Sequence, residues 1–92
     1  MAQVYLPTPL RRATHGQARV AAEGRTVEEA LATLERRYPG LREQLRDPTG
    51  EVRSFINVFV NGTEIRSLQG SATPLREDDE ISIIPAMAGG RR

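Results

Sequence analysis

The sequence predicts one α+β domain, in which a mixed sheet of four to five strands is crossed by one main helix. Three observations support this fold class. A long apolar stripe with helical spacing lies near the middle of the chain, runs of alternating apolar residues lie on both sides of it, and turn-forming residues separate the runs. With 92 residues, the chain is also too short to stabilise two separate cores.

The first two strands are predicted before residue 23. Apolar residues occupy every second position there, namely Val4, Leu6, Ala18, Val20 and Ala22. This period of two is typical of half-buried strands, which we expect to pair as a hairpin with a long loop containing Pro7 and Pro9. Leu10 is expected to fold back over the core; the alternative is that residues 10–12 contact a partner.

The main helix is predicted to begin at Val27, because Thr26 and Glu29 have the spacing of a capping box. Its apolar stripe consists of Val27, Ala30, Leu31, Leu34 and Tyr38, and the charged residues Glu28, Glu35, Arg36 and Arg37 are expected to face water. Pro39-Gly40 should end the helix, since proline donates no amide hydrogen bond. A short helical turn over residues 41–45 is expected to follow.

The remaining strands are predicted after a turn at residues 47–50. Residues 55–60 form the most strand-like run, and Asn61-Gly62 favours a tight hairpin turn from which residues 63–66 return antiparallel. A short helical turn is expected at residues 73–75, a charged reversal at 77–79 and the last strand at 81–84. With the first and last strands adjacent in the middle of the sheet, this order gives the β-grasp fold.

Composition excludes several classes of function. The basic residues number 13 against 12 acidic ones, which gives a formal charge of +1 and makes a nucleic-acid partner a poor hypothesis. All the basic residues are arginines, so a lysine Schiff base is excluded, and the absence of cysteine excludes disulfides and thiolate chemistry. No apolar run is long enough for a membrane span or a signal peptide, so we expect a cytoplasmic protein without a membrane partner.

The usual catalytic arrangements are also missing. His15 is the single histidine, and we expect it to be a solvated loop residue. The acidic residues 77–80 are consecutive, so they cannot all point at one cation, and a solvated turn is the preferred interpretation. We therefore expect no enzyme activity and no bound metal or cofactor.

The functional group is predicted to lie at the C-terminal end of the sequence. Residues 1–85 should form the β-grasp domain, and residues 86–92 a flexible tail that contains the diglycine Gly89-Gly90. Because these glycines lack a Cβ, a partner could enclose their backbone in a narrow channel and hold a carboxylate at Gly90 beside a bound nucleotide. The alternative is a frayed end without a function.

Three segments carry a resemblance to a known family. They are residues 6–11 (LPTPLR), residues 58–61 (VFVN) and, above all, residues 83–90 (IIPAMAGG). In these segments and in the order of its elements, nearly the whole chain resembles the ThiS/MoaD family of ubiquitin-like sulfur carriers. It is most similar to the CysO-type carriers of cysteine biosynthesis.

The resemblance implies a mechanism. An E1-like enzyme would use ATP and magnesium to adenylate Gly90, a sulfur donor would convert the adenylate into a thiocarboxylate, and a synthase would accept the sulfur. The acceptor could be a precursor of cysteine, molybdopterin, thiazole or another thio-metabolite. An alternative is a ubiquitin-like modifier that forms isopeptide bonds through Gly90, and a third is an interaction domain whose tail has no role.

The sequence departs from the family pattern after the diglycine. Reactive family members end at the second glycine, whereas here Arg91-Arg92 follow. We expect a peptidase of the JAMM metalloprotease type to remove both; the alternative is that they are a cloning residue.

A carrier without a pocket has to be recognised by its surface. If Ile56, Val58 and Val60 face the helix, alternation places Phe59 on the other side of the sheet. We expect Phe59, Ile84 and Met87 to form the docking surface for the activating enzyme. The alternative is that Phe55 or Phe59 packs beneath the hairpin or the N-terminal loop.

Overall fold

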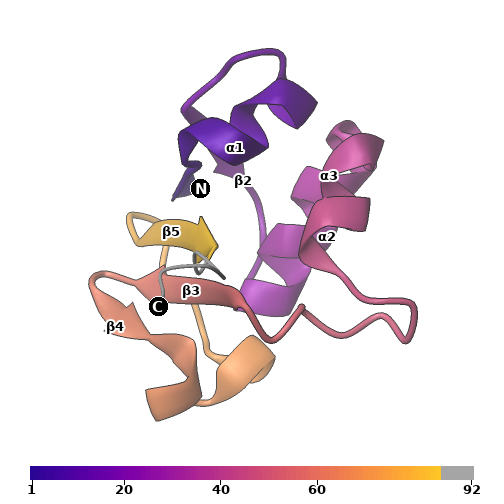
Figure 1. Cartoon of the computed structure of the whole chain (residues 1–92). Helices are drawn as coiled ribbons and strands as arrows, with labels where there is room; N and C mark the ends of the chain where they lie inside the picture. The colour runs from indigo at the N-terminus through magenta and orange to yellow at the C-terminus, as the bar shows by residue number, and fades with distance from the viewer. Residues whose placement is uncertain (86–92) are drawn as a thin grey trace.

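The fold is a five-stranded mixed sheet packed against helices on one side (Figure 1). The computed structural model describes residues 1–85. The strands are β1 (Ala2–Tyr5), β2 (Arg19–Ala22), β3 (Ile56–Val60), β4 (Thr63–Glu64) and β5 (Glu80–Pro85), in the order β2-β1-β5-β3-β4. β1 and β5 are parallel and central, and the other pairs are antiparallel, which confirms the predicted β-grasp order.

Three α-helices and three single turns of 3-10 helix complete the described part of the chain. The α-helices are α1 (Thr8–Arg11), α2 (Val27–Arg37) and α3 (Pro39–Leu45), and the 3-10 turns are η1 (Arg12–Thr14), η2 (Ile65–Ser67) and η3 (Gly70–Ala72). α2 and α3 lie on the same side of the sheet (Figure 1). The main helix was predicted, and the short turn predicted over residues 41–45 is part of α3, which begins two residues earlier at Pro39.

The core lies between α2 and the inner face of the sheet, the face that looks towards this helix. Strand residues alternate along it, so that Ile56, Val58 and Val60 of β3 are buried together with Ile81 and Ile83 of β5. The predicted stripe of α2 is buried in full. One apolar face on each element is therefore enough to account for a single core.

The start of α2 combines two devices. The Thr26 hydroxyl accepts a hydrogen bond from the Glu29 amide at 3.2 Å, and the Glu29 carboxylate accepts one from the Arg25 amide at 2.8 Å. The Val27 amide, one of the free donors of the first turn, donates to the Thr73 carbonyl at 3.0 Å. The predicted helical turn at residues 73–75 is therefore wrong. Pro74 forms an antiparallel β-bridge with Thr26, and the chain is extended there, which places the Thr73 carbonyl beside the first turn of α2.

Glu35 was predicted to face water, and this prediction is wrong. Its carboxylate is buried and accepts hydrogen bonds from Nε of Arg46 at 2.8 Å and from Nη2 at 3.2 Å. The buried Arg46 also donates to the Glu28 carboxylate and to the Gly50 carbonyl. Burial by itself lowers the pKa of Arg46. The hydrogen bonds to the Glu35 and Glu28 carboxylates raise this pKa by more than burial lowers it, so the net pKa lies above its ordinary value.

The predicted loop between the first strands is an ordered cap formed by α1 and η1. Leu10 is buried in the core, as predicted. Thr14, which was not predicted to matter, is completely buried, and its hydroxyl lies 3.2 Å from the Arg11 carbonyl and 2.8 Å from the Gln17 carbonyl. The Leu6 amide then donates to the Ala18 carbonyl and closes the hairpin.

Two glycine positions follow from backbone geometry. The Asn61-Gly62 turn has φ values of 50° and 87°, the left-handed conformations that this dipeptide adopts readily, as predicted. Gly24 joins β2 to α2, and a Cβ at this position would lie 2.4 Å from the Ala30 amide nitrogen. The sequence at residue 24 is therefore restricted to glycine by the close approach of α2.

An arginine covers backbone carbonyls at each edge of the sheet. On the β2 edge, Arg37 of α2 donates to the Ala21 carbonyl at 3.1 Å. On the other edge, β4 covers only Phe59 and Val60 of β3. Arg66 donates to the Ile56 carbonyl at 3.2 Å, in the part of β3 that β4 leaves uncovered. Both edges are thus partly blocked against a further strand.

Candidate functional site

The central strand β5 leads directly to the predicted reactive segment. Its last residue, Pro85, lies opposite Ile56 of β3, and its neighbour Ile84 lies opposite Asn57. Met87, Gly89, Gly90, Arg91 and Arg92 lie outside the described residues, so the structure gives no geometry for them. It does show that residue 86 follows a strand that pairs with β1 as far as Ser82 and with β3 as far as Pro85.

The outer face of the sheet, which looks away from α2, carries the two described residues of the predicted docking surface. Pairing aligns Phe59 with Ser82 and Ser82 with Tyr5, so these side chains form a row across three strands. Phe59 is half-buried, whereas Ile84 in the neighbouring row keeps 47% of its surface exposed. The predicted outward orientation is confirmed, while the docking role stays a prediction.

Phe55, which was considered as a residue packed beneath a neighbouring segment, is 47% exposed. It lies immediately before β3 and one residue from the pair formed by Ile56 and Pro85. The partial burial of Phe59 is consistent with its position between Ser82 and Glu64, the residue that lies opposite it on β4. The apolar part of the outer face therefore lies near the end of β5.

The same row ends in a cation on the opposite edge. Arg19 of β2 lies opposite Tyr5 of β1, and its guanidinium carbon is 5.8 Å from the centre of the tyrosine ring. Nη1 of Arg19 donates to the Tyr5 hydroxyl at 3.4 Å, and this contact raises the pKa of Arg19. Sequence periodicity did not identify the pair, because the register between β1 and β2 sets it.

The other residues considered for chemistry lie apart from this face. His15 is exposed and stands edge-on to Tyr38, with 5.8 Å between ring centres. In the acidic turn, Asp79 accepts hydrogen bonds from the Arg76 amide and the Asn61 side chain, which hold its pKa below the usual range. Among residues 1–85, no group of three His, Cys, Asp or Glu side chains is arranged to hold a metal.

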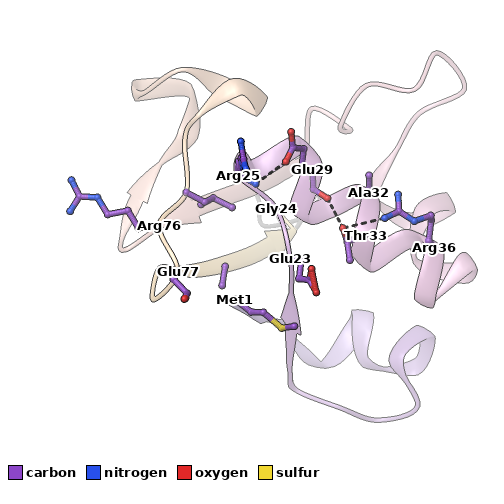
Figure 2. A pocket seen from close by; sticks show the side chains of 12 residues that line it. Met1, Glu23, Gly24, Arg25, Glu29, Ala32, Thr33, Arg36, Arg76 and Glu77 are labelled. Carbon is purple, nitrogen blue, oxygen red and sulfur yellow. Dashed lines mark hydrogen bonds between the residues drawn. The ribbon is translucent and has the colours of Figure 1, made fainter.

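An open groove of about 750 Å³ lies at the end of the sheet where β1 begins. Arg36 and Arg76 line it on opposite sides, and the Arg76 guanidinium points away from the other labelled side chains (Figure 2). Its charged lining residues are Glu23, Arg25, Glu29, Arg36, Arg76 and Glu77. The two signs are balanced, so the lining selects neither anions nor cations, and the groove lies at the opposite end of the sheet from Pro85.

In the described part of the chain, no helix has both the length and the apolar character needed to cross a membrane. The α-helices there are α1, α2 and α3, and the longest of them, α2, has 11 residues.

The chain is similar to known proteins along nearly its whole length. The profile of the ThiS family matches residues 4–90. The sulfur carrier protein CysO of Mycobacterium tuberculosis is 40% identical over 89 residues, which cover 95% of this chain and 96% of that protein.

Two solved structures have the same fold. A chain in the crystal structure of the Amycolatopsis orientalis BexX/CysO complex superposes with a TM-score of 0.90 at 36% identity, covering 98% of this chain and 100% of that one. The solution structure of small archaeal modifier protein 1 from Methanosarcina acetivorans gives 0.87 at 33% identity and covers 97% and 95% of the two chains. The matched residues include both the outer face of the sheet and the strand that leads to the diglycine.

Proposed function

The chain belongs to the ThiS family, and from this premise we propose that it is a sulfur carrier whose reactive group is the carboxyl carbon of Gly90. The observation that carries the proposal is the family match, which runs through β5 and ends at residue 90. The similarity to sulfur carrier protein CysO over 95% of the chain supports it. In this role the protein is a substrate and sulfur donor for partner enzymes and does not catalyse a reaction itself.

The first step is cleavage of the bond between Gly90 and Arg91. As long as this amide is intact, Gly90 has no carboxylate to activate. Water hydrolyses the bond, which leaves a carboxylate on Gly90 and an amine on Arg91. We assign this step to a peptidase of the JAMM metalloprotease type, and both arginines are lost in it.

Activation and sulfur loading follow on an E1-like adenylating enzyme. The Gly90 carboxylate attacks the α-phosphorus of ATP and expels pyrophosphate, while magnesium held by that enzyme offsets the phosphate charge. A sulfide-level donor then attacks the acyl carbon and expels AMP, which leaves a thiocarboxylate. The carrier itself supplies no cysteine to this chemistry, because its sequence has none.

A sulfur-accepting synthase completes the cycle. The thiocarboxylate sulfur attacks an electrophilic carbon of the acceptor and displaces its leaving group, which forms a thioester. Water then hydrolyses this thioester, which returns the Gly90 carboxylate and leaves the sulfur on the acceptor as a thiol. CysO of Amycolatopsis orientalis has been crystallised in a complex with BexX, which supports the view that a carrier of this shape docks on a partner protein.

Phe59, Ile84 and Met87 are assigned to docking on the activating enzyme. Phe59 and Ile84 are apolar residues on the open face of β3 and β5, and Met87 lies two residues beyond Pro85. Apolar groups that are grouped on one open face are typical of protein interfaces. The segment that follows β5 would then enter the active site while this face rests on the enzyme.

The test of the proposed function is intact-protein mass spectrometry. The chain truncated after Gly90 is incubated with an E1-like adenylating enzyme, ATP, magnesium and a sulfide donor. We expect a mass shift equal to the replacement of one oxygen by sulfur. The 92-residue chain is the control and should stay unchanged; a thiocarboxylate formed on a chain that still ends in Arg92 would contradict the processing step.

The docking assignment is tested with alanine variants in the same reaction. Phe59→Ala and Ile84→Ala should each slow adenylation at low carrier concentration by about tenfold or more, as expected for truncating an interface anchor. Leu68→Ala is the matched control, because Leu68 is 45% exposed and lies outside the strands. Unchanged rates for both outer-face variants would remove the assignment.

A second function is favoured by one of the similar structures. Small archaeal modifier protein 1 has the same fold at 33% identity, so a modifier that forms isopeptide bonds through Gly90 is the alternative. The same activated carrier, mixed with a lysine-containing protein extract, would distinguish the two. Crosslinked products that depend on Gly90 indicate a modifier, whereas a stable thiocarboxylate without them indicates a carrier.

A further inference from the structure

Charge is divided unevenly along the chain. Residues 1–22 contain Arg11, Arg12 and Arg19 and no acidic residue. Residues 76–80 contain Arg76 followed by four consecutive carboxylates, at positions 77–80. The small net charge of the whole chain, +1, therefore hides a basic segment and an acidic segment.

The topology places these segments at opposite ends of the sheet. α1 and η1 connect the end of β1 to the start of β2, where Tyr5 lies opposite Arg19. Because β5 runs parallel to β1, its last residue, Pro85, lies at this basic end. The acidic turn lies at the other end. There Gln3 pairs with Glu80, and the Gln3 backbone amide donates a hydrogen bond to the Asp79 carbonyl.

Two of the arginines at the basic end are available to a partner. Arg12 and Arg19 are exposed, and no carboxylate among residues 1–85 lies within 4.0 Å of either guanidinium; Glu80, one row from Arg19, acts on it only at longer range. Arg11 is less available, because its Nε donates to the Leu6 carbonyl at 3.0 Å. We call Arg12 and Arg19 the cationic flank.

The cap fixes the backbone at Arg12, and the strand pairing fixes it at Arg19. The buried Thr14 ties η1 to the Arg11 and Gln17 carbonyls, and the Gly16 amide donates to the Arg11 carbonyl at 2.7 Å. Arg19 rests against Tyr5 in the row that also contains Phe59. Arg19 therefore lies in the outer-face row with its guanidinium held against Tyr5, so it has less conformational entropy to lose on binding than a free side chain, whereas for Arg12 the backbone position in η1 is fixed.

We propose that the cationic flank binds an acidic surface on the activating enzyme and steers the carrier so that its Pro85 end arrives first. This inference rests on the proposed function, because only a carrier that delivers residues 86–90 gains from this orientation. A partner with carboxylates beside the entrance to its active site attracts the basic end and repels the acidic turn. Such steering raises association rates by about 10–1000-fold at low ionic strength and fades as salt is added.

The test measures association kinetics between the activating enzyme and the chain truncated after Gly90. The double variant R12E/R19E should associate about tenfold more slowly than the unmodified carrier at about 50 mM salt, and the difference should shrink towards about 500 mM. Arg12→Gln combined with Arg19→Gln should give a smaller loss. Thermal unfolding confirms that each variant is folded before its rates are compared.

The matched control is R36E/R76E, which makes the same change in net charge away from the flank. Both residues are exposed and line the groove at the other end of the sheet (Figure 2). We expect this variant to associate faster than R12E/R19E. Equal losses in the two variants would overturn the proposal, because net charge alone would then set the rate.

Three further results separate this inference from the proposed function. If the unmodified carrier is adenylated but R12E/R19E associates at the same rate, the flank has no steering role and the inference is overturned. If the unmodified carrier is not adenylated at all, the proposed function fails and takes this inference with it. If a short single-stranded RNA binds the carrier and R12E/R19E abolishes that binding without changing adenylation, the flank serves nucleic acid, and the inference is likewise overturned.

Discussion

The two faces of the sheet differ in what covers them, although the same strands form both. On the inner face, Ile81 and Ile83 are completely buried under α2 and the rest of the core. On the outer face, Ser82 and Ile84 alternate with them on the same strand, and Ile84 is half exposed. Burial and exposure thus fall on adjacent residues of one strand, so each face should respond differently to substitution.

The largest effect is expected at the buried ion pair between Glu35 of α2 and Arg46, which follows α3. Arg46→Ala leaves the buried Glu35 without its hydrogen-bonded arginine and with only the exposed Arg42 at 3.7 Å, and should lower the free energy of unfolding by about 3–5 kcal/mol. Urea denaturation measures the loss. Replacing both residues, with Glu35→Leu and Arg46→Met, should recover most of it; a double variant as unstable as Arg46→Ala would show that the cost does not come from the unpaired charge.

Ile83 and Ile84 provide the direct comparison of the two faces. Ile83→Ala should lower the free energy of unfolding by about 2–5 kcal/mol, because it opens a cavity in the core. Ile84→Ala should cost about 1 kcal/mol or less, since roughly half of its side chain already contacts water. The adenylation rate should show the reverse order when both variants are folded, with the larger loss in Ile84→Ala. Similar stability losses in the two variants would contradict the difference between the faces.

Gly24 tests how closely α2 approaches the sheet. Gly24→Ala places a methyl group against the backbone of Ala30 and should lower the free energy of unfolding by about 1–3 kcal/mol. Gly40→Ala is the control, because a Cβ there would lie 3.9 Å from the Ala13 side chain, an ordinary van der Waals distance. Chemical denaturation of both variants would show whether the connection between β2 and α2 is as tight as the structure indicates.

The smallest effect is expected from pH at the acidic turn, which belongs to neither face. The pKa of Asp79 is lowered in the folded chain by the Arg76 amide and the Asn61 side chain. Its stabilising contribution is therefore present above the unfolded pKa of about 3.9 and is lost as pH falls through the lower folded value. Asp79→Asn should make the unfolding free energy less sensitive to pH below about 4, as measured by urea denaturation at several pH values.

The periodic elements could be predicted because each of them buries one face. The α2 stripe and the β3 alternation repeat with the period of their secondary structure, and Asn61-Gly62 has few alternatives to its turn. Residues 73–75 were misjudged because their conformation depends on a contact that is distant in sequence. The Thr73 carbonyl accepts a hydrogen bond from the Val27 amide, and no local sequence pattern predicts this contact.

The buried ion pair was missed for a different reason. Glu35 follows Leu31 by four residues, so helical periodicity places it beside the apolar stripe, but its charge suggested a solvated position. Its partner Arg46 lies beyond α3, and only the turn of the chain at Pro39 brings the two together. At the site, the outward direction of Ile84 followed from alternation, whereas the contact between Tyr5 and Arg19 required the strand register.

The guanidinium groups at the sheet edges have a consequence for a protein that is proposed to carry one sulfur atom per copy. Such a reagent must remain monomeric when many copies are present, and unpaired strand edges are the usual starting points of intermolecular ladders. Arg37 and Arg66 fill hydrogen-bonding positions that a second chain would otherwise use. The two arginines therefore disfavour self-association through the sheet edges, while the outer face keeps Ile84 exposed.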